Sequence, residues 1–158
     1  MAVTTDIIAS WRRPRATIRR HLARGVSEAF AFTILLVFLT LAFVSQWPEA
    51  SHEAFLANEP SAAPRLLARA LAVLATIPLW YGVAALSRLL ARAFGGRGSW
   101  YSARMALFWA MLAVSPLVLF HGLIRGFLGD GLQATVVGLL VLAGFLYLWL
   151  AMMIEAER

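Results

Sequence analysis

The sequence of 158 residues contains no cysteine and no lysine, so arginine supplies all 14 of its permanently cationic side chains. The absence of cysteine excludes disulfides, thiolate metal sites and a cysteine nucleophile. Charged residues make up only 14% of the chain, compared with about 25% in a typical soluble domain. Apolar residues make up 61%, compared with roughly 45–50% in soluble domains. This composition predicts a protein that is solvated largely by lipid.

The sequence also lacks the short motifs that carry catalysis. It has no HExxH, no phosphate-binding P-loop and no G-x-S-x-G, and no pair of carboxylates falls inside a long apolar run. We therefore expect a protein that is not an enzyme and that holds no metal and no cofactor.

Four long runs contain no charged residue. A hydrocarbon core of about 30 Å requires roughly 20 apolar residues in a helix, and each run is close to that length. Buried helices of soluble proteins keep a polar face, which these runs do not have. The sequence predicts an all-α transmembrane bundle, in which an amphipathic segment at residues 1–28 precedes a transmembrane domain at residues 29–158. The predicted spans are residues 29–47, 70–87, 105–124 and 131–154.

The arginines are unevenly distributed between the connections. Six precede the first span and four lie between the second and third spans, where there is no acid, while the connection between the first and second spans contains Glu49, Glu53 and Glu59. Cytoplasmic loops are enriched in basic residues. We therefore expect a bacterial inner-membrane protein with both termini in the cytoplasm. The bacterial origin is an interpretation of arginine usage together with abundant Ala, Leu and Gly.

The connection at residues 48–64 is predicted to lie on the opposite, outer side of the membrane. It resembles a loop, or a short amphipathic helix that begins at Ser51 and ends before Pro60 and Pro64. A solvated loop is the favoured interpretation of its polar residues.

The amphipathic segment has apolar residues spaced along one helical face, at Ile7, Ile8, Trp11, Ile18 and Leu22. Pro14 is expected to begin the main helix, because proline is tolerated in the first turn. The pattern is typical of a helix that lies in the headgroup layer of an anionic leaflet. The alternative is an anchor that only orients the first span. A nucleic-acid-binding role is disfavoured, because the basic cluster is short and no accompanying binding motif is present. The candidate lipid- or partner-binding residues here are Trp11, Arg12, Arg13, Arg15, Arg19 and Arg20.

Two prolines interrupt the predicted spans, Pro78 in the second and Pro116 in the third. Each removes a backbone hydrogen bond and favours a kink. We favour a role in shaping the bundle, with a substrate path as the alternative.

His121 lies near the outer end of the third span and is interpreted as a structural interfacial histidine. It cannot share a haem with His21 in one subunit, because the predicted topology places them on opposite sides; ligation of haem or chlorophyll together with another chain is the less favoured alternative.

Pairs of small residues recur four apart in the spans, which permits close helix approach. These pairs are Ala68/Ala72, Gly122/Gly126 and Ala134/Gly138.

A glycine-rich loop precedes the third span. Gly95, Gly96 and Gly98 permit a tight turn, and arginines surround them. One interpretation is a phosphate-binding nest of backbone amides. The favoured one is a re-entry turn with aromatic anchors. The candidate residues are Arg92, Arg97, Arg104, Trp100 and Tyr101, together with the three glycines.

This loop, Gly95-Gly96-Arg97-Gly98-Ser99-Trp100, leads into a helix that contains Pro116, and the segment Trp11-Arg12-Arg13-Pro14-Arg15 lies upstream. Together these features resemble the bacterial branch of the Yip (Ypt-interacting protein) domain family. The resemblance implies an integral membrane protein with a cytoplasmic N-terminal helix that starts at a proline. Family members commonly have five spans, whereas this sequence predicts four. For bacterial members the resemblance implies no known catalysis.

Two functions from different classes follow. The first is a membrane-organising adaptor or an accessory subunit of a larger complex, for example a respiratory or photosynthetic one. Its expected partners are anionic headgroups at the cytoplasmic face and other integral membrane proteins. The alternative is a small oligomeric transporter or channel that uses the Pro78 and Pro116 breaks.

Overall fold

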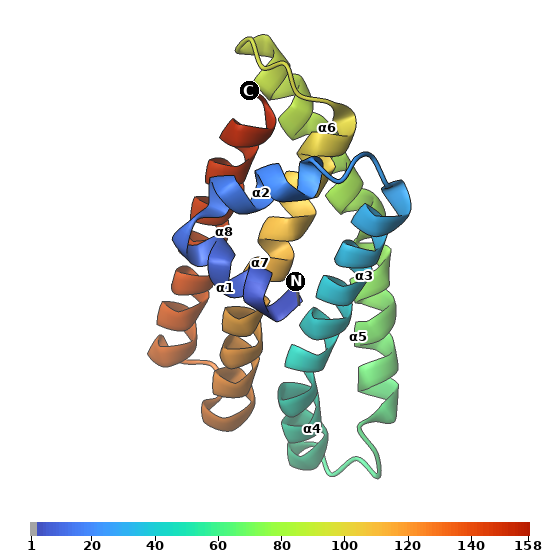
Figure 1. Ribbon diagram of the computed structural model, residues 1–158. Helices are drawn as coiled ribbons and strands as arrows, with labels where there is room; N and C mark the ends of the chain where they lie inside the picture. The colour runs from blue at the N-terminus through green and yellow to red at the C-terminus, as the bar shows by residue number, and fades with distance from the viewer. Residues whose placement is uncertain (1–2) are drawn as a thin grey trace.

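The computed structural model describes residues 3–158, and in that range every regular element is a helix. Four stretches are long and apolar enough to cross a membrane: Glu28–Leu56, Ala63–Ala93, Trp100–Leu128 and Leu132–Ala156. They run up and down in turn (Figure 1). The prediction of an all-α polytopic bundle is therefore confirmed. The helices are α1 (Val3–Arg12), α2 (Pro14–Leu22), α3 (Glu28–Ser45), α4 (Trp47–Leu56), α5 (Ala63–Ala75), α6 (Ile77–Ala93), α7 (Trp100–Leu128) and α8 (Leu132–Ala156).

The first span extends further than the charge-free run indicates, because α4 continues almost directly from α3. Ser45 and Gln46 side chains both donate to the backbone carbonyl of Ala42, at 2.7 and 3.2 Å, and so satisfy a carbonyl at the end of α3. The next helix begins at Trp47 rather than at Ser51, with Pro48 in its first turn, where proline costs no hydrogen bond. Most of the expected outer loop is thus helical.

The second span is divided at Thr76, two residues before Pro78. The Thr76 hydroxyl donates to the carbonyl oxygen of Val73 at 2.6 Å and accepts from the Trp80 indole at 3.0 Å. These bonds satisfy polar groups at the break. Pro116, by contrast, lies inside the uninterrupted helix α7.

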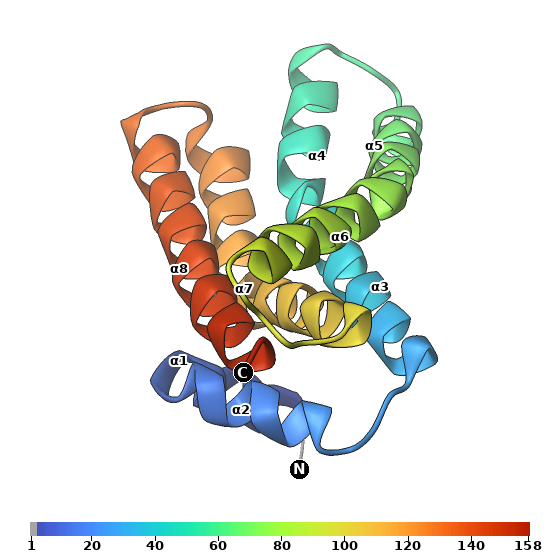
Figure 2. The ribbon, with the colours of Figure 1, turned by 90° about the horizontal axis from the view of Figure 1, so that it is seen from above.

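Helix α7 is the central element of the bundle, packed against α3, α4, α6 and α8 (Figure 2). Nearly every residue from Tyr101 to Ser115 is buried. Close approach to the first span depends on Gly122 and Gly126. A Cβ atom at Gly122 would lie 2.0 Å from the Ser45 carbonyl oxygen, and one at Gly126 would lie 2.2 Å from Pro48 Cβ. The spacing of these two glycines therefore corresponds to a real helix contact.

The other small-residue pairs behave differently. Ala68 and Ala72 are exposed within this chain. Ala134 is buried, and a Cβ atom at Gly138 would lie 3.3 Å from His121 Nε2.

Candidate functional site

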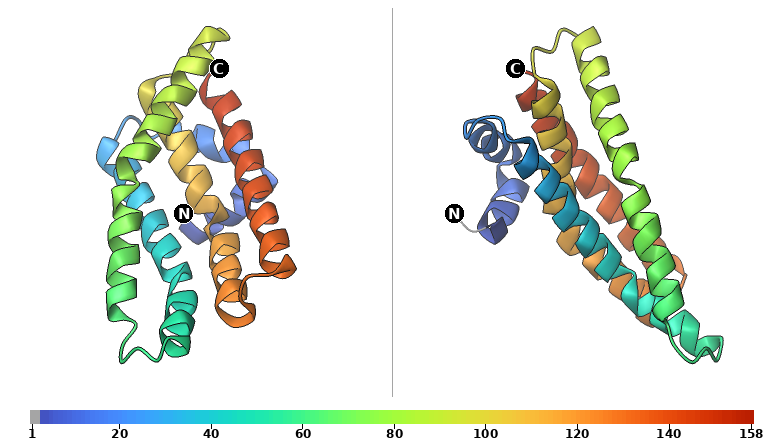
Figure 3. Two further views of the ribbon diagram at one scale, coloured as in Figure 1. Left: turned by 180° about the vertical axis from the view of Figure 1, so that it is seen from behind. Right: turned by 90° about the vertical axis from the view of Figure 1, so that its right-hand side faces the viewer.

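Helices α1 and α2 stand against the side of the bundle, near the end at which α7 begins and α8 finishes (Figure 3, right). We call this end, comprising α1, α2, the glycine loop at residues 94–99 and the adjoining ends of α6, α7 and α8, the arginine end. The α1–α2 pair bends at Arg13, and Pro14 occupies the first turn of α2 as the sequence predicts.

A buried polar chain fastens α1 to α7. The Trp109 indole donates to Ser10 Oγ at 2.9 Å, and Ser10 Oγ donates to the Asp6 carbonyl oxygen at 2.7 Å. Trp109, Ser10 and Asp6 are all almost fully buried. The buried indole N–H requires an acceptor, and this requirement brings a polar stripe of α1 onto the bundle.

Trp11 also inserts between two spans. Its indole donates to the Ala113 carbonyl oxygen at 3.0 Å, and a Cβ atom on Gly144 of α8 would lie 2.6 Å from its ring. Ala113 is thirteen residues after Trp100, roughly 20 Å along α7 at the usual helical rise. Helix α1 is therefore anchored against the flank of the spans.

The predicted apolar face of the segment is present in part. Ile18 is fully buried, and Ile7, Trp11 and Leu22 pack against the core. Ile8, however, is 61% exposed. The reason is that the Asp6–Ser10 stripe contacts α7 and turns Ile8 outward.

His21 lies beneath this contact, with its ring 3.9 Å from the ring of Trp109. The pKa of His21 is lowered to about 4, chiefly by burial and also by the nearby Arg24 and Arg20, while Asp6 opposes the shift. His21 Nε2 is 3.9 Å from Asp6 Oδ2, too far for a hydrogen bond. Asp6 also pairs with Arg20 at 3.3 Å and Arg24 at 4.0 Å. The carboxylate is compensated by the arginines, and the imidazole stays neutral at pH 7.

The glycine loop contacts the end of α8. The Gly98 amide donates to Glu157 Oε2 at 3.0 Å, Arg88 donates to the same oxygen at 2.8 Å, and the Arg97 amide donates to the Glu157 carbonyl oxygen at 2.9 Å. A Cβ atom at Gly98 would lie 2.5 Å from the Ala156 carbonyl oxygen. The loop thus holds a carboxylate of the chain itself at the place where the sequence suggested an external phosphate.

The other two positions of the loop require glycine for different reasons. Gly95 has a φ of 87°, which favours glycine. A Cβ atom at Gly96 would lie 2.5 Å from Glu157 Oε2. Of the two aromatic candidates, Trp100 is half exposed and Tyr101 is buried.

The ion pairs separate the arginines into two groups. All eight acidic residues lie within 4.0 Å of an arginine. Three of the candidate arginines are among those paired: Arg19 with Glu155 at 2.6 Å, Arg20 with Asp6, and Arg104 with Glu28. Within residues 3–158, five guanidinium groups have no such pair, and all five belong to the arginine end: Arg12, Arg13, Arg15, Arg92 and Arg97.

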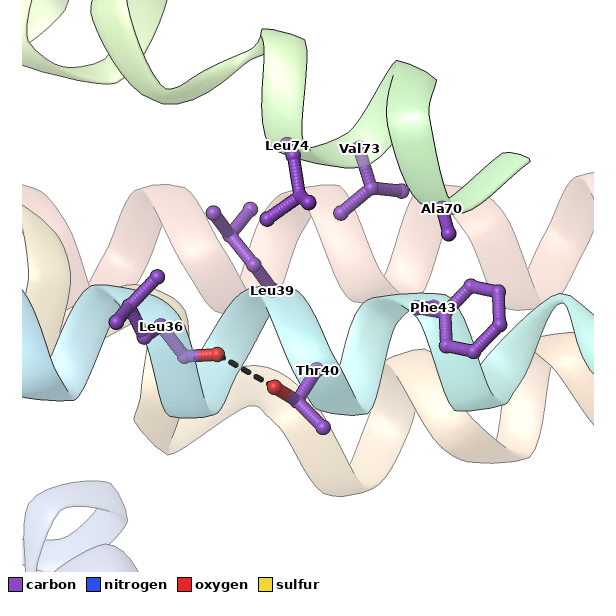
Figure 4. Close-up of a pocket in the computed structure, with 7 residues that line it drawn as sticks. All are labelled: Leu36, Leu39, Thr40, Phe43, Ala70, Val73 and Leu74. Atoms are coloured by element: carbon purple, nitrogen blue, oxygen red, sulfur yellow. Dashed lines mark hydrogen bonds between the residues drawn. The ribbon is translucent and has the colours of Figure 1, made fainter. Parts of the chain in front are cut away.

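Two apolar cavities lie among the spans. One, of about 150 Å³, lies between α3 and α5, where Leu39 faces Leu74 and Phe43 lies below Ala70 (Figure 4). Its one hydroxyl, on Thr40, donates to the Leu36 carbonyl oxygen of its own helix at 2.8 Å. The second cavity, of about 260 Å³, is lined by side chains of α3, α6, α7 and α8, including His121.

His121 uses Nε2 in a 3.1 Å contact with the Ala134 carbonyl oxygen, which ties α7 to α8. Among the described residues there is no group of three or more His, Cys, Asp or Glu side chains placed to hold a metal ion.

A bundle of four apolar helical stretches with a cationic end defines the class: an all-α, multi-pass integral membrane protein. No curated protein and no solved structure matches the chain. The sequence profile of the Yip1 domain matches residues 8–156, nearly the whole chain. The protein therefore belongs to the Yip1 domain family.

Proposed function

We propose that this protein is a non-catalytic adaptor or accessory subunit of a larger membrane complex. We place it in a bacterial inner membrane with the arginine end in the cytoplasm, because cytoplasmic connections are enriched in basic residues. In this orientation both termini are cytoplasmic.

The surface of the second span carries this proposal. Only 6% of the residues in its most apolar 18-residue stretch are buried, and no residue of α5 is buried within the chain. Leucines such as Leu67 and Leu71 of α5 are about 60% exposed. Within this chain α5 contacts α3 and α4 on one side only, and its opposite face has no helix packed against it. The exposed α5 face suits a transmembrane helix of a partner.

The arginine end supports a second contact, with anionic lipid. Five unpaired guanidinium groups near the cytoplasmic leaflet would each contribute on the order of 1 kcal/mol to attraction toward an anionic surface. This contact would hold the adaptor in a fixed orientation.

Co-purification tests the proposed function. The full chain, tagged at its C-terminus, is extracted in gentle detergent, and its partners are identified and quantified by mass spectrometry. We expect stoichiometric capture of one membrane complex, lost in L67A/L71A on α5. The matched control is L139A/L142A on α8, which removes leucines that are also more than half exposed and should leave capture unchanged. A homo-oligomer without other proteins, or equal loss in both variants, contradicts the proposal.

Transport through a small oligomer is a second candidate, favoured by the helix break at Thr76 next to Pro78. Solute flux in proteoliposomes, compared between wild type, P78A and P116A, tests it. Negligible flux in all three excludes it for the solutes used.

A further inference from the structure

A groove with a volume of about 550 Å³ lies between α1 and α2 at their bend. Arg12 and Arg13 line it from the bend, Arg20 and Thr17 line it from α2, and Ile8 lines it from α1. The groove is separate from the α7 contact, because α1 faces α7 through Asp6, Ser10 and Trp11.

The charge of the groove is strongly positive. The guanidinium groups of Arg12 and Arg13 make no ion pair and no hydrogen bond within the described chain. Arg20 pairs with Asp6 at 3.3 Å, an acid it shares with Arg24, and donates to Thr17 Oγ1 at 3.4 Å, so its charge is partly compensated. Two uncompensated charges therefore remain in one groove. Guanidinium groups bind phosphate oxygens with paired, charge-assisted hydrogen bonds.

The apolar wall of the groove indicates the source of that phosphate. Ile8 is 61% exposed on α1, and Trp11 of the same helix is inserted between α7 and α8. A soluble phosphate would gain nothing from an isoleucine. A phospholipid places its phosphate directly beside apolar chains, which matches a groove that has arginines beside an exposed isoleucine.

We infer that the α1–α2 groove is a discrete site for the phosphate of an anionic phospholipid, held by Arg12 and Arg13 with the lipid chains beside Ile8. This inference deepens the lipid contact of the proposed function and rests on it. It adds that binding is confined to one groove and is not spread over all the arginines.

Arg15 provides the matched control, because it is also unpaired, lies on α2 one residue after Pro14 and does not line the groove. The test uses the full chain in detergent, with phosphatidylglycerol or phosphatidylcholine added, and native mass spectrometry to count retained lipids. Wild type and R15Q are expected to retain one phosphatidylglycerol in preference to phosphatidylcholine. R12Q/R13Q is expected to retain it on the order of 30-fold more weakly, because two surface arginines are removed.

Three outcomes overturn the inference: R15Q loses phosphatidylglycerol as strongly as R12Q/R13Q, phosphatidylcholine binds equally well, or an excess of inorganic phosphate displaces the lipid. The last would show a site for free phosphate.

Equal melting temperatures of the variants show that each is folded. If R12Q/R13Q does not fold, R12K/R13K is used in its place. This pair keeps the charge and loses the paired guanidinium geometry, so its retention is expected to be intermediate, and wild-type retention overturns the inference. Partner capture is measured on the same samples. A variant that loses the lipid but still captures the partner shows that lipid binding in the groove and the adaptor function are separate properties.

Discussion

The second and third spans are alike in length and hydropathy and opposite in environment. Their lengths are 31 and 29 residues and their mean hydropathies are 1.7 and 2.0. Yet 56% of the residues in the most apolar 18-residue stretch of the third span are buried, compared with 6% for the second span. Hydropathy thus identifies a helix that spans the membrane, but it does not distinguish the centre of a bundle from its periphery.

The two spans are held by different forces. Helix α7 is held along its length, by close contacts at Gly122 and Gly126 and by the indole bond of Trp109. The second span packs against the core along one side only, through residues such as Ala84 and Tyr81, and is also held by ion pairs near its ends. Arg69 contacts Glu49 at 3.1 Å and Glu53 at 2.8 Å near one end, and Arg88 contacts Glu157 at 2.8 Å near the other. Lipid supplies no hydrophobic force between helices, so shape and polar contacts decide which helix is central.

The comparison predicts its largest effect at Trp109. W109A removes a buried side chain, its bond to Ser10 and its contact with His21, and should destabilise the protein by about 3–5 kcal/mol. The measurement is the free energy of unfolding in mixed micelles titrated with SDS. The control, L71A on the second span, removes a side chain that is 59% exposed and should cost well under 1 kcal/mol. Equal losses would refute the claim that α7 is the centre.

A second prediction concerns the pH dependence of the α2–α7 contact. The pKa of His21 is lowered to about 4 by burial, so the folded state binds fewer protons than the unfolded state between about pH 4 and 6.5. Its contribution is fully present above pH 6.5 and is lost as the pH falls through this window. The shift corresponds to about 3 kcal/mol.

Unfolding free energy measured from pH 7.5 to pH 4.5 should therefore fall in wild type. The fall should be smaller in H21Q, while H52Q, which changes an exposed histidine of α4, should follow wild type. Hydrogen exchange should show the opening at α2 and α7 and not at α5. A pH profile that is the same in H21Q as in wild type would mean that other groups dominate.

A third prediction compares glycines on the two spans. In G122A the new Cβ would meet the backbone of Ser45 at 2.0 Å, and we expect a cost of about 1–3 kcal/mol. In G82A on the second span nothing lies within 4 Å, so the melting temperature should be unchanged or slightly higher. Melting temperatures in detergent measure both. A stable G122A would show that the end of α3 moves away from α7 easily.

Much of this architecture follows from local patterns. The four spans follow from charge-free runs, and the start of α2 follows from Pro14, because a bilayer and a proline ring act on a helix independently of its neighbours. The extension of the first span through α4 did not follow, since Pro48 resembles a helix end when it in fact occupies a first turn.

The candidate site was only partly predictable. Sequence placed the arginines at one end, but it could not separate the unpaired Arg12 and Arg13 from the paired Arg19 and Arg20, because their acids are distant in sequence or on another helix. The contact of Ser10 with Trp109, and the bond from Ser10 to Asp6 behind it, were missed for a different reason. A periodicity of apolar residues cannot reveal a helix that packs through its polar stripe. The only available signal was the spacing of Asp6 and Ser10, four residues apart on one helical face.

The smallest expected effect is at Glu157, which joins the second span to the rest of the bundle at the arginine end. E157Q weakens the contacts with Arg88 and Gly98, with a global cost of about 1 kcal/mol. Because α6 has few other contacts there, we expect faster hydrogen exchange in the last turns of α6 and in residues 94–99, with unchanged exchange in α7. The control E155Q loses a pair with Arg19 on α2 and should leave α6 unchanged. If exchange rises equally in α7 after E157Q, the end of the second span is integral to the core, and the contrast between the two spans does not extend to their ends.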